Sequence, residues 1–319
     1  MRALRAAAVE RPVLVHGHLH EGALIGWVVA RTFRIPLIFD FQGSLTSEMI
    51  DHHFLAPASQ AYRAFRKAEE WIVRRPDAIV TSTRAGADLL QRDFAPSVDV
   101  SVVPDAVDTT RFRPRWEIAE EDGYLARIDG LRASLGIPAD RKVVVYLGLL
   151  AEYQGVTHLL KAAQLLVKRG LNVHFLIMGF PGEDSYGRTA DSLGLKGHVT
   201  FTGAVPYERA HEHLALGDIA VSPKISETEG NGKILDYIAM GLPTVTFATR
   251  ASQEILGDLG VYARTGDWEE LAQRIQDLAE DPRGAEARGR ALREKAVNCH
   301  SWDLSAETLL QTYENVGAI

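Results

Sequence analysis

Charged and small residues gather between two apolar segments of the chain, 219–221 and 243–247. Both segments have the composition of buried parallel strands. A helix is predicted between them, from Lys233 to about Met240, ahead of a Gly-Leu-Pro sequence that ends it. The start of such a helix presents unpaired backbone N–H groups and the positive end of a dipole, and Lys233 adds a full positive charge there. This arrangement would bind an anion such as a phosphate group.

The loop before this helix and the first helical turn supply further groups for a ligand. Gly230 and Gly232 leave room for a phosphate to approach the backbone, and Lys224 is a second cation. Asp236 lies one turn into the helix, where its carboxylate could accept two hydrogen bonds from a sugar diol. The candidate binding residues of this region are Lys224, Gly230, Asn231, Gly232, Lys233 and Asp236. A plain βαβ unit with a solvated acidic loop is the alternative interpretation.

The rest of the chain must place these groups at the edge of a sheet. Strand patterns alternate with helical patterns along the sequence, which is typical of doubly wound parallel sheets. Ligands of such sheets bind at the carboxyl ends of the strands, and Gly148 is predicted at one of these ends. The predicted strands are 12–15, 36–43, 77–80 and 100–103 in the first part of the chain, and 142–148, 173–178, 199–202, 219–221 and 243–247 in the second.

Three alternating histidines, His16, His18 and His20, are predicted in a loop after the strand 12–15. In an extended backbone they would share one face, which would suit a metal ion. No further cluster of Cys, His or carboxylate residues stands out in the sequence to complete such a site, so no essential metal is expected. A histidine held by a structural hydrogen bond is the other interpretation.

The order of a strand, then SETEGNGK, ILDY and AMGLPTV, resembles the donor-binding signature of retaining GT-B glycosyltransferases, the bacterial group 1 family. In that family, two glutamates separated by seven residues precede an Ala-Met-Ala-Gly-Pro run. The resemblance implies that Asp236 takes the place of the second glutamate, which holds the nucleotide ribose. The first glutamate contacts the donor sugar, and strict spacing puts it at Thr228. Glu229 is the favoured counterpart and Glu227 the next.

The resemblance implies a GT-B-like α/β fold with two doubly wound, Rossmann-like parallel-sheet domains facing a cleft. The expected domains are residues 1–112, which bind the acceptor and receive the C-terminal helix 301–319, and residues 113–300, which bind the donor. The family's first domain opens with a strand and a glycine-rich loop that have no counterpart before Val13. We therefore expect a shortened first domain, either from a truncated gene product or in a protein that a partner chain completes.

Three positions depart from the family's usual residues. Leu149 and Gln154 stand where the family has an arginine and a lysine that neutralise the donor diphosphate. The diphosphate would then depend on Lys233, Lys224 and helix-end amides, each set of amides contributing about 0.3–2 kcal/mol. Gln42 stands where a histidine usually lines the reacting sugar, and it can form hydrogen bonds but does not change charge near neutral pH.

The function that these features imply is transfer of a sugar from a nucleotide-diphosphate sugar to a hydroxyl acceptor, a glycan or lipid-linked molecule, with retained anomeric configuration and no cofactor. Gln42, His18 and His20 would face the reacting centre from the first domain. The replaced residues motivate a second hypothesis, a nucleotide-sugar-binding subunit with little catalytic activity. A GT-B-fold nucleotide-sugar epimerase or hydrolase is a third.

Composition narrows the cellular setting. The 319 residues suffice for two domains, and 35 basic against 42 acidic residues argue against nucleic acid as a partner. Cys299 is the single cysteine, no apolar run reaches bilayer length, and residues 1–11 lack the apolar core of a signal peptide. A cytoplasmic protein is expected. The predicted helix 59–75 mixes aromatic and basic residues, which indicates either a core face with a solvated face or peripheral contact with the inner face of the membrane.

Overall fold

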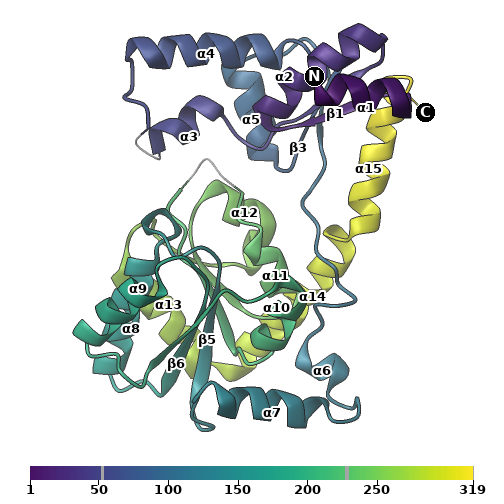
Figure 1. The fold of residues 1–319 in the computed structure, drawn as a ribbon. Coiled ribbons are helices and arrows are strands. Elements are labelled where there is room, and N and C mark those ends of the chain that lie inside the picture. Colours follow the sequence, from purple (N-terminus) through teal and green to yellow (C-terminus); the bar gives the residue numbers. More distant parts are fainter. Residues whose placement is uncertain (52–53, 227–229, 319) are drawn as a thin grey trace. The chain divides into compact units, whose positions relative to one another are not determined.

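The computed structural model describes residues 1–51, 54–226 and 230–318. The chain forms two compact units (Figure 1). Of the described residues, unit 1 contains 1–51, 54–105, Gly230 and 302–318, and unit 2 contains 106–226 and 231–301. None of the described helices combines the length and the apolar composition that crossing a membrane requires.

Unit 1 is built on a parallel sheet in which β1, β2, β3 and β4 lie side by side in chain order. Side chains alternate between its two faces. Phe39 and Ile79 pack under α2, α4 and α5, whereas Ile38 and Val80 pack against α15. The elements are α1 (Arg2–Glu10), β1 (Val15–His18), α2 (Leu19–Phe33), β2 (Leu37–Asp40), α3 (Leu45–Asp51), α4 (Gln60–Val73), β3 (Ala78–Thr81), α5 (Arg84–Asp93), β4 (Val100–Val102) and α15 (Trp302–Asn315).

The first strand was predicted three residues too early. The structure places β1 at Val15–His18, so two of the three histidines lie in the strand and His20 lies in α2. Pro12 has no N–H group for a ladder, and pairing with β2 begins at Val15, whose N–H donates to the Pro36 carbonyl at 2.8 Å. The strand then packs directly on the α2 backbone, since a Cβ on Gly17 would lie 2.7 Å from the Ala23 nitrogen.

Unit 2 is built on a six-stranded parallel sheet with the order β10-β9-β8-β5-β6-β7. Its central strand is covered on both faces, because Val143 and Val145 belong to one apolar cluster and Val144 and Tyr146 to the other. The strands are β5 (Lys142–Leu147), β6 (Val173–Met178), β7 (Val199–Gly203), β8 (Ile219–Ser222), β9 (Thr244–Phe247) and β10 (Val261–Ala263).

The helices of unit 2 flank this sheet. The first cluster includes residues of α7, α10, α11 and α14, and the second includes residues of α8 and α13. The helical elements are α6 (Arg115–Ile118), α7 (Tyr124–Ser134), η1 (Glu152–Gln154), α8 (Val156–Lys168), α9 (Glu183–Ser192), α10 (Tyr207–Leu214), α11 (Lys233–Ala239), α12 (Arg250–Leu256), η2 (Gly257–Leu259), α13 (Trp268–Glu280) and α14 (Pro282–Cys299). The predicted architecture, two parallel-sheet α/β domains, is confirmed.

Candidate functional site

The winding of unit 2 reverses between β5 and β8. From β5 the chain proceeds outward to β6 and β7, and it then returns to the other side of β5 to form β8, β9 and β10. In an open α/β sheet, ligands bind outside the carboxyl ends of the strands at such a switch point. Gly148 follows β5 and Lys224 lies two residues after β8, so both predicted residues are at this edge.

Backbone contacts fix the loops at this edge. A Cβ on Gly155 would lie only 1.8 Å from the Pro223 carbonyl oxygen, so the turn after η1 and the loop after β8 approach as closely as glycine allows. The Ile225 N–H donates to the Tyr153 carbonyl at 2.9 Å and ties the same two loops together. The switch point therefore has a defined backbone shape independent of any ligand.

Lys233 lies at this edge as the first residue of α11. Its Nζ donates to Gln154 Oε1 at 2.6 Å and to Tyr146 Oη at 3.4 Å, and it lies 4.6 Å from the centroid of the Tyr146 ring. A Cβ on Gly148 would be 2.7 Å from Nζ. The ammonium group is thus held at the carboxyl end of β5, in space that only a glycine leaves open.

Gln154 and Leu149 have different roles from the family residues they replace. Gln154 is 7% exposed and supplies a neutral acceptor that holds Lys233. Leu149 is 44% exposed, and its backbone carbonyl accepts a hydrogen bond from Tyr146 at 2.7 Å. Neither position therefore carries the positive charge that the family has there. Gln154 instead positions Lys233.

Asp236 lies one turn further along α11 and is 8% exposed. The Tyr207 hydroxyl donates to its Oδ1 at 3.2 Å. Burial raises the pKa of Asp236 to about 7, because the hydrogen bond from Tyr207 only partly compensates for the lost hydration. Burial also raises the pKa of Tyr207, which remains a donor at neutral pH. The carboxylate can accept hydrogen bonds from a ligand, and its ability to do so changes near neutral pH.

Asn231 positions the loop before α11. It is 2% exposed, its Oδ1 accepts from Ser222 Oγ at 2.9 Å, and its Nδ2 donates to Ser252 Oγ at 3.0 Å. Thr249 Oγ1 donates to the same Ser252 oxygen at 2.8 Å. The Asn231 side chain is therefore engaged within the protein, and we expect it to hold the backbone of this loop in place.

The other predicted residues of this region differ in exposure. Gly230 and Gly232 are exposed, and Gly232 is the N-cap of α11 with no atom within 4 Å of a Cβ built on it. Lys224 is 3% exposed and follows β8. Glu227 and Glu229, the candidates for contact with the donor sugar, lie outside the described residues.

Unit 1 has its own polar cluster at the carboxyl edge of its sheet, centred on Asp40 at the end of β2. Asp40 Oδ2 lies 2.6 Å from His18 Nδ1, and Asp40 Oδ1 accepts from Gln42 Nε2 at 2.5 Å. His16 Nε2 is 4.0 Å from the same carboxylate, and His16 Nδ1 is 2.7 Å from the Tyr313 hydroxyl. Burial lowers the pKa of His16, although the Asp40 charge raises it in part.

This cluster can accept a proton or a hydrogen bond from a hydroxyl group. The His18 side chain is 64% exposed. Because the Asp40 carboxylate accepts only, it holds a proton on Nδ1 and leaves Nε2 of the neutral ring as an acceptor. Gln42 and His18, which were predicted separately, thus contact the same carboxylate, that of Asp40, which was not predicted as a site residue.

His20 is apart from the other two histidines. It is 5% exposed in α2, and its Nε2 lies 3.5 Å from Glu69 Oε1, a carboxylate that also accepts from Thr46 at 2.6 Å. Burial raises the pKa of Glu69, but the nearby His20 ring and the Thr46 and Ser44 hydroxyl groups bring it below its ordinary value. The structural interpretation therefore fits His20. No group of three His, Cys, Asp or Glu side chains in the described part of the chain is arranged to hold a metal ion.

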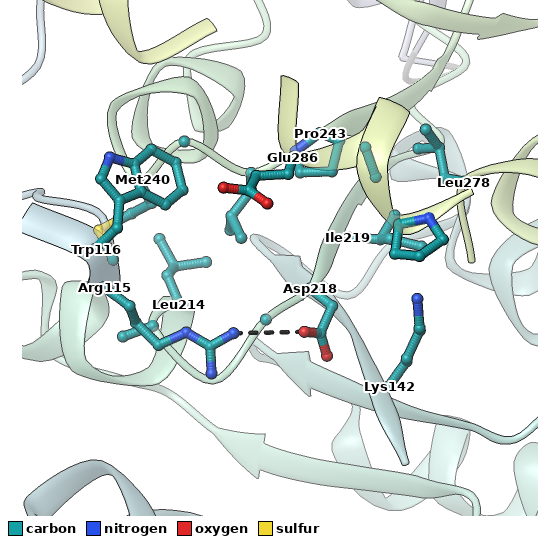
Figure 2. Close-up of a pocket in the computed structure, with 16 residues that line it drawn as sticks. Arg115, Trp116, Lys142, Leu214, Asp218, Ile219, Met240, Pro243, Leu278 and Glu286 are labelled. Atoms are coloured by element: carbon teal, nitrogen blue, oxygen red, sulfur yellow. Dashed lines mark hydrogen bonds and ion pairs between the residues drawn. The ribbon is translucent and has the colours of Figure 1, made fainter. Parts of the chain in front are cut away.

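A separate pocket of about 270 Å³ lies at the amino edge of the unit 2 sheet, at the starts of β5, β8 and β9. Figure 2 shows Arg115 pointing toward Asp218, to which it forms an ion pair at 3.4 Å. Lys142 Nζ donates to the Ala279 carbonyl at 2.8 Å. These charges are engaged within the protein, and the pocket is at the opposite edge from Gly148 and Lys233, so we do not assign it to the donor.

The residues that position the site were not among those predicted from the sequence. Tyr207, Tyr146 and Asp40 each support a predicted residue. A polar residue that ends a buried strand, as Asp40 does, was a usable signal for one of them. The other two are 29 and 87 residues from their partners, which no local pattern connects.

Two protein-family models match the sequence of this chain. A family model for glycosyl transferases group 1 matches residues 128–296, and one for the glycosyl transferase 4-like domain matches residues 1–106. The D-inositol 3-phosphate glycosyltransferase of Rhodococcus opacus (strain B4) is 26% identical over 94% of this chain and 66% of its own length. The relative of the same name from Thermomonospora curvata is 27% identical over 97% of this chain and 74% of its own.

Solved structures share the fold. Sucrose-phosphate synthase from Thermosynechococcus elongatus has a TM-score of 0.82 at 19% identity, covering 99% of this chain and 77% of that one. Anabaena HepE in complex with UDP has a TM-score of 0.80 at 16% identity, covering 100% and 81%. The chain spans 66% of the length of the Rhodococcus relative. Since the group 1 model covers more than half of the 319 residues, the chain belongs to the glycosyl transferases group 1 family.

Proposed function

We propose that this chain transfers a sugar from a nucleotide-diphosphate sugar to a hydroxyl acceptor, and that the product retains the anomeric configuration of the donor. The observation that carries the proposal is the pair formed by Lys233 and Asp236. One is a cation held at the switch point of the sheet, and the other is a buried carboxylate one helical turn away. A diphosphate and the adjacent ribose diol require groups of these two kinds.

In this proposal, unit 2 binds the donor and stabilises the departing diphosphate. Lys233 and the backbone around Gly230 and Gly232 bind the phosphates, Lys224 adds positive charge, and Asp236 binds the ribose. Catalysis then comes mainly from positioning and from stabilising the charge that develops on the leaving group. Glu229 or Glu227 would contact the donor sugar. The reaction would need no essential metal, because Lys233 supplies the positive charge.

Unit 1 binds the acceptor in this proposal. His18 and Gln42, held by Asp40, would orient the hydroxyl group that attacks the sugar. The HepE structures are complexes with UDP and with UDP-glucose, which supports uridine donors as the first to test. The relatives named D-inositol 3-phosphate glycosyltransferase support testing phosphorylated polyols alongside glycans and lipid-linked sugars as acceptors.

The test is to incubate the chain with UDP-glucose and each acceptor, and to measure UDP release and the anomeric configuration of the product by NMR. An α-linked product from this α-linked donor is expected. A β-linked product would overturn retention. The Lys233→Ala variant, which removes the proposed diphosphate contact, is the matched negative control.

The second candidate is a nucleotide-sugar-binding subunit with little turnover, and Leu149 is the observation that favours it. An exposed aliphatic side chain lies at the switch point where the family has an arginine. This candidate predicts saturable donor binding without product, and turnover only when a partner chain is supplied. An epimerase, the third candidate, would convert the donor when no acceptor is present.

A further inference from the structure

A basic groove of about 740 Å³ lies at the amino edge of the unit 1 sheet, where α2, α4 and α15 end. This is the opposite edge of the sheet from the Asp40 cluster. Four arginines line it together with one carboxylate, that of Asp77. The arginines of this groove are Arg31, Arg34, Arg74 and Arg75.

None of these four guanidinium groups has an ion-pair or hydrogen-bond partner among the described residues. The Asp77 carboxylate is engaged elsewhere, because its Oδ2 accepts the Leu37 N–H at 2.8 Å. Arginines in this chain are otherwise often paired with carboxylates, as Arg264 and Arg293 are. The groove therefore concentrates positive charge that the fold itself does not neutralise.

Helix ends do not account for this charge. The C-termini of α2, α4 and α15 each carry a partial negative charge of about 0.5, which favours nearby arginines. Together with Asp77, the three helix ends supply a negative charge of about 2.5 against four full positive charges. A net positive charge of about 1.5 remains in a chain whose overall net charge is −7.

One of the arginines is held in position by aromatic rings. The Arg75 guanidinium lies 4.4 Å from the Trp71 ring centroid and 5.8 Å from that of Trp27, and the two rings pack edge to face at 5.0 Å. Stacking restrains the guanidinium plane while its N–H groups remain available to a ligand. Planar guanidinium groups donate in pairs to phosphate oxygens.

We propose that this groove binds a phosphate-bearing anion. The same chemistry describes a free phosphorylated molecule and the headgroup of an anionic phospholipid. Exposed apolar side chains lie on the same helices: Trp71 of α4 is 37% exposed, and Phe33 and Val28 of α2 are 37% and 43% exposed. These side chains would suit contact with a lipid surface if the ligand is a phospholipid headgroup. The groove shares no residue with the proposed donor site, whose Lys233 and Asp236 belong to unit 2.

The experiment compares Arg31→Gln/Arg74→Gln with a matched pair of neutralised, exposed residues of unit 2, Lys161→Gln/Arg188→Gln. Both pairs are made in a Lys233→Ala background, so that the donor site does not bind the probe. In one arm pyrophosphate is titrated by calorimetry. In the other, vesicles of phosphatidylcholine with or without phosphatidylglycerol are sedimented with the protein. Circular dichroism confirms that each variant is folded.

We expect binding in at least one arm, weakened at least about tenfold by the groove pair and less than about twofold by the control pair. Binding of pyrophosphate identifies a free phosphate as the source, and binding to phosphatidylglycerol vesicles alone identifies a headgroup. Absence of binding in both arms would overturn the proposal. Equal weakening by the two pairs would overturn it as well, because the charge would then act without a site.

Discussion

The two units hold their polar groups at the carboxyl edges of their sheets in different ways. In unit 2 the sheet reverses its winding between β5 and β8, and glycines let the backbone close around the switch point. A Cβ on Gly179 would lie 1.8 Å from the Gly148 carbonyl oxygen. In unit 1 the described strands follow chain order, and the cluster is held by side chains around one carboxylate, that of Asp40.

From this difference we expect unit 2 to bind the nucleotide and unit 1 to orient the hydroxyl group that reacts. A rigid, backbone-built edge with a fixed ammonium group suits the part of a ligand that is always the same, such as a nucleotide diphosphate. An exposed imidazole oriented by a carboxylate suits a hydroxyl group that must lose its proton during the reaction. Substitutions at the switch point of unit 2 should therefore change nucleotide affinity, and substitutions in the Asp40 cluster of unit 1 should leave that affinity unchanged.

The largest effect is expected for Lys233→Ala. It removes a charge-assisted contact of about 1.5–3 kcal/mol, so affinity for the nucleoside diphosphate should fall about 10- to 100-fold in calorimetric titration. Lys168→Ala, at the exposed end of α8, is the control and should change affinity less than about twofold. Equal effects of the two substitutions would remove the distinction between the switch point and the rest of the surface.

Gly148→Ala tests the backbone-built edge itself. The φ of Gly148 is 147°, and the new Cβ would lie 2.7 Å from Lys233 Nζ, so it should displace the ammonium group and cost about 1–3 kcal/mol of stability. Nucleotide affinity should fall by about tenfold or more. Gly130→Ala in α7 is the control, since nothing lies within 4 Å of its Cβ and helix propensity should raise stability by about 0.5–1 kcal/mol.

The raised pKa of Asp236 predicts a pH dependence in unit 2. Because a protonated carboxyl is a weaker acceptor, nucleotide affinity should fall as the pH drops below about 7, and Asp236→Asn should abolish that dependence. The same pKa, above its unfolded value, means that stability decreases as the pH rises from about 4 to 7. Asp236→Asn should therefore raise the unfolding temperature at pH 8 more than at pH 4.

Asp40→Asn should have the smallest effect on binding and a selective effect on turnover. The substitution weakens the hold on His18 and Gln42, so kcat/KM for the acceptor should fall about tenfold, while nucleotide affinity should change by less than about twofold. Steady-state kinetics and titration on the same preparation separate the two quantities. A parallel loss of nucleotide affinity would show that nucleotide binding and acceptor orientation are not separated between the two units.

The sequence predicted most of the fold because its strands are apolar runs with clear ends. The β5 prediction, 142–148, ends one residue beyond the observed Leu147. Helix α14 received no prediction, although Asp281 and Pro282 carry the signal. The Asp281 side chain caps Gly284 N–H at 3.0 Å, and Pro282 occupies the first turn. Strand β10, with three residues, is too short for its periodicity to be recognised.

The candidate site was less predictable, because its geometry depends on contacts distant in sequence. Lys233 and Asp236 were found from a local pattern at a helix start. Their partners Gln154 and Tyr207 lie 79 and 29 residues away. Gln154, which stands where the family usually has a lysine, is the residue that holds Lys233. Local spacing gives the type of a residue and its element, whereas the partner is set by the packing of the sheet.

The central claim, a nucleotide-sugar site at the switch point of unit 2, is tested most directly by calorimetric titration with uridine, guanosine and adenosine diphosphates, repeated on Asp236→Ala. We predict saturable binding of one of the three and a loss of at least about tenfold in the variant, because the ribose loses its acceptor. Binding of none of them, or equal binding by the variant, would contradict the assignment.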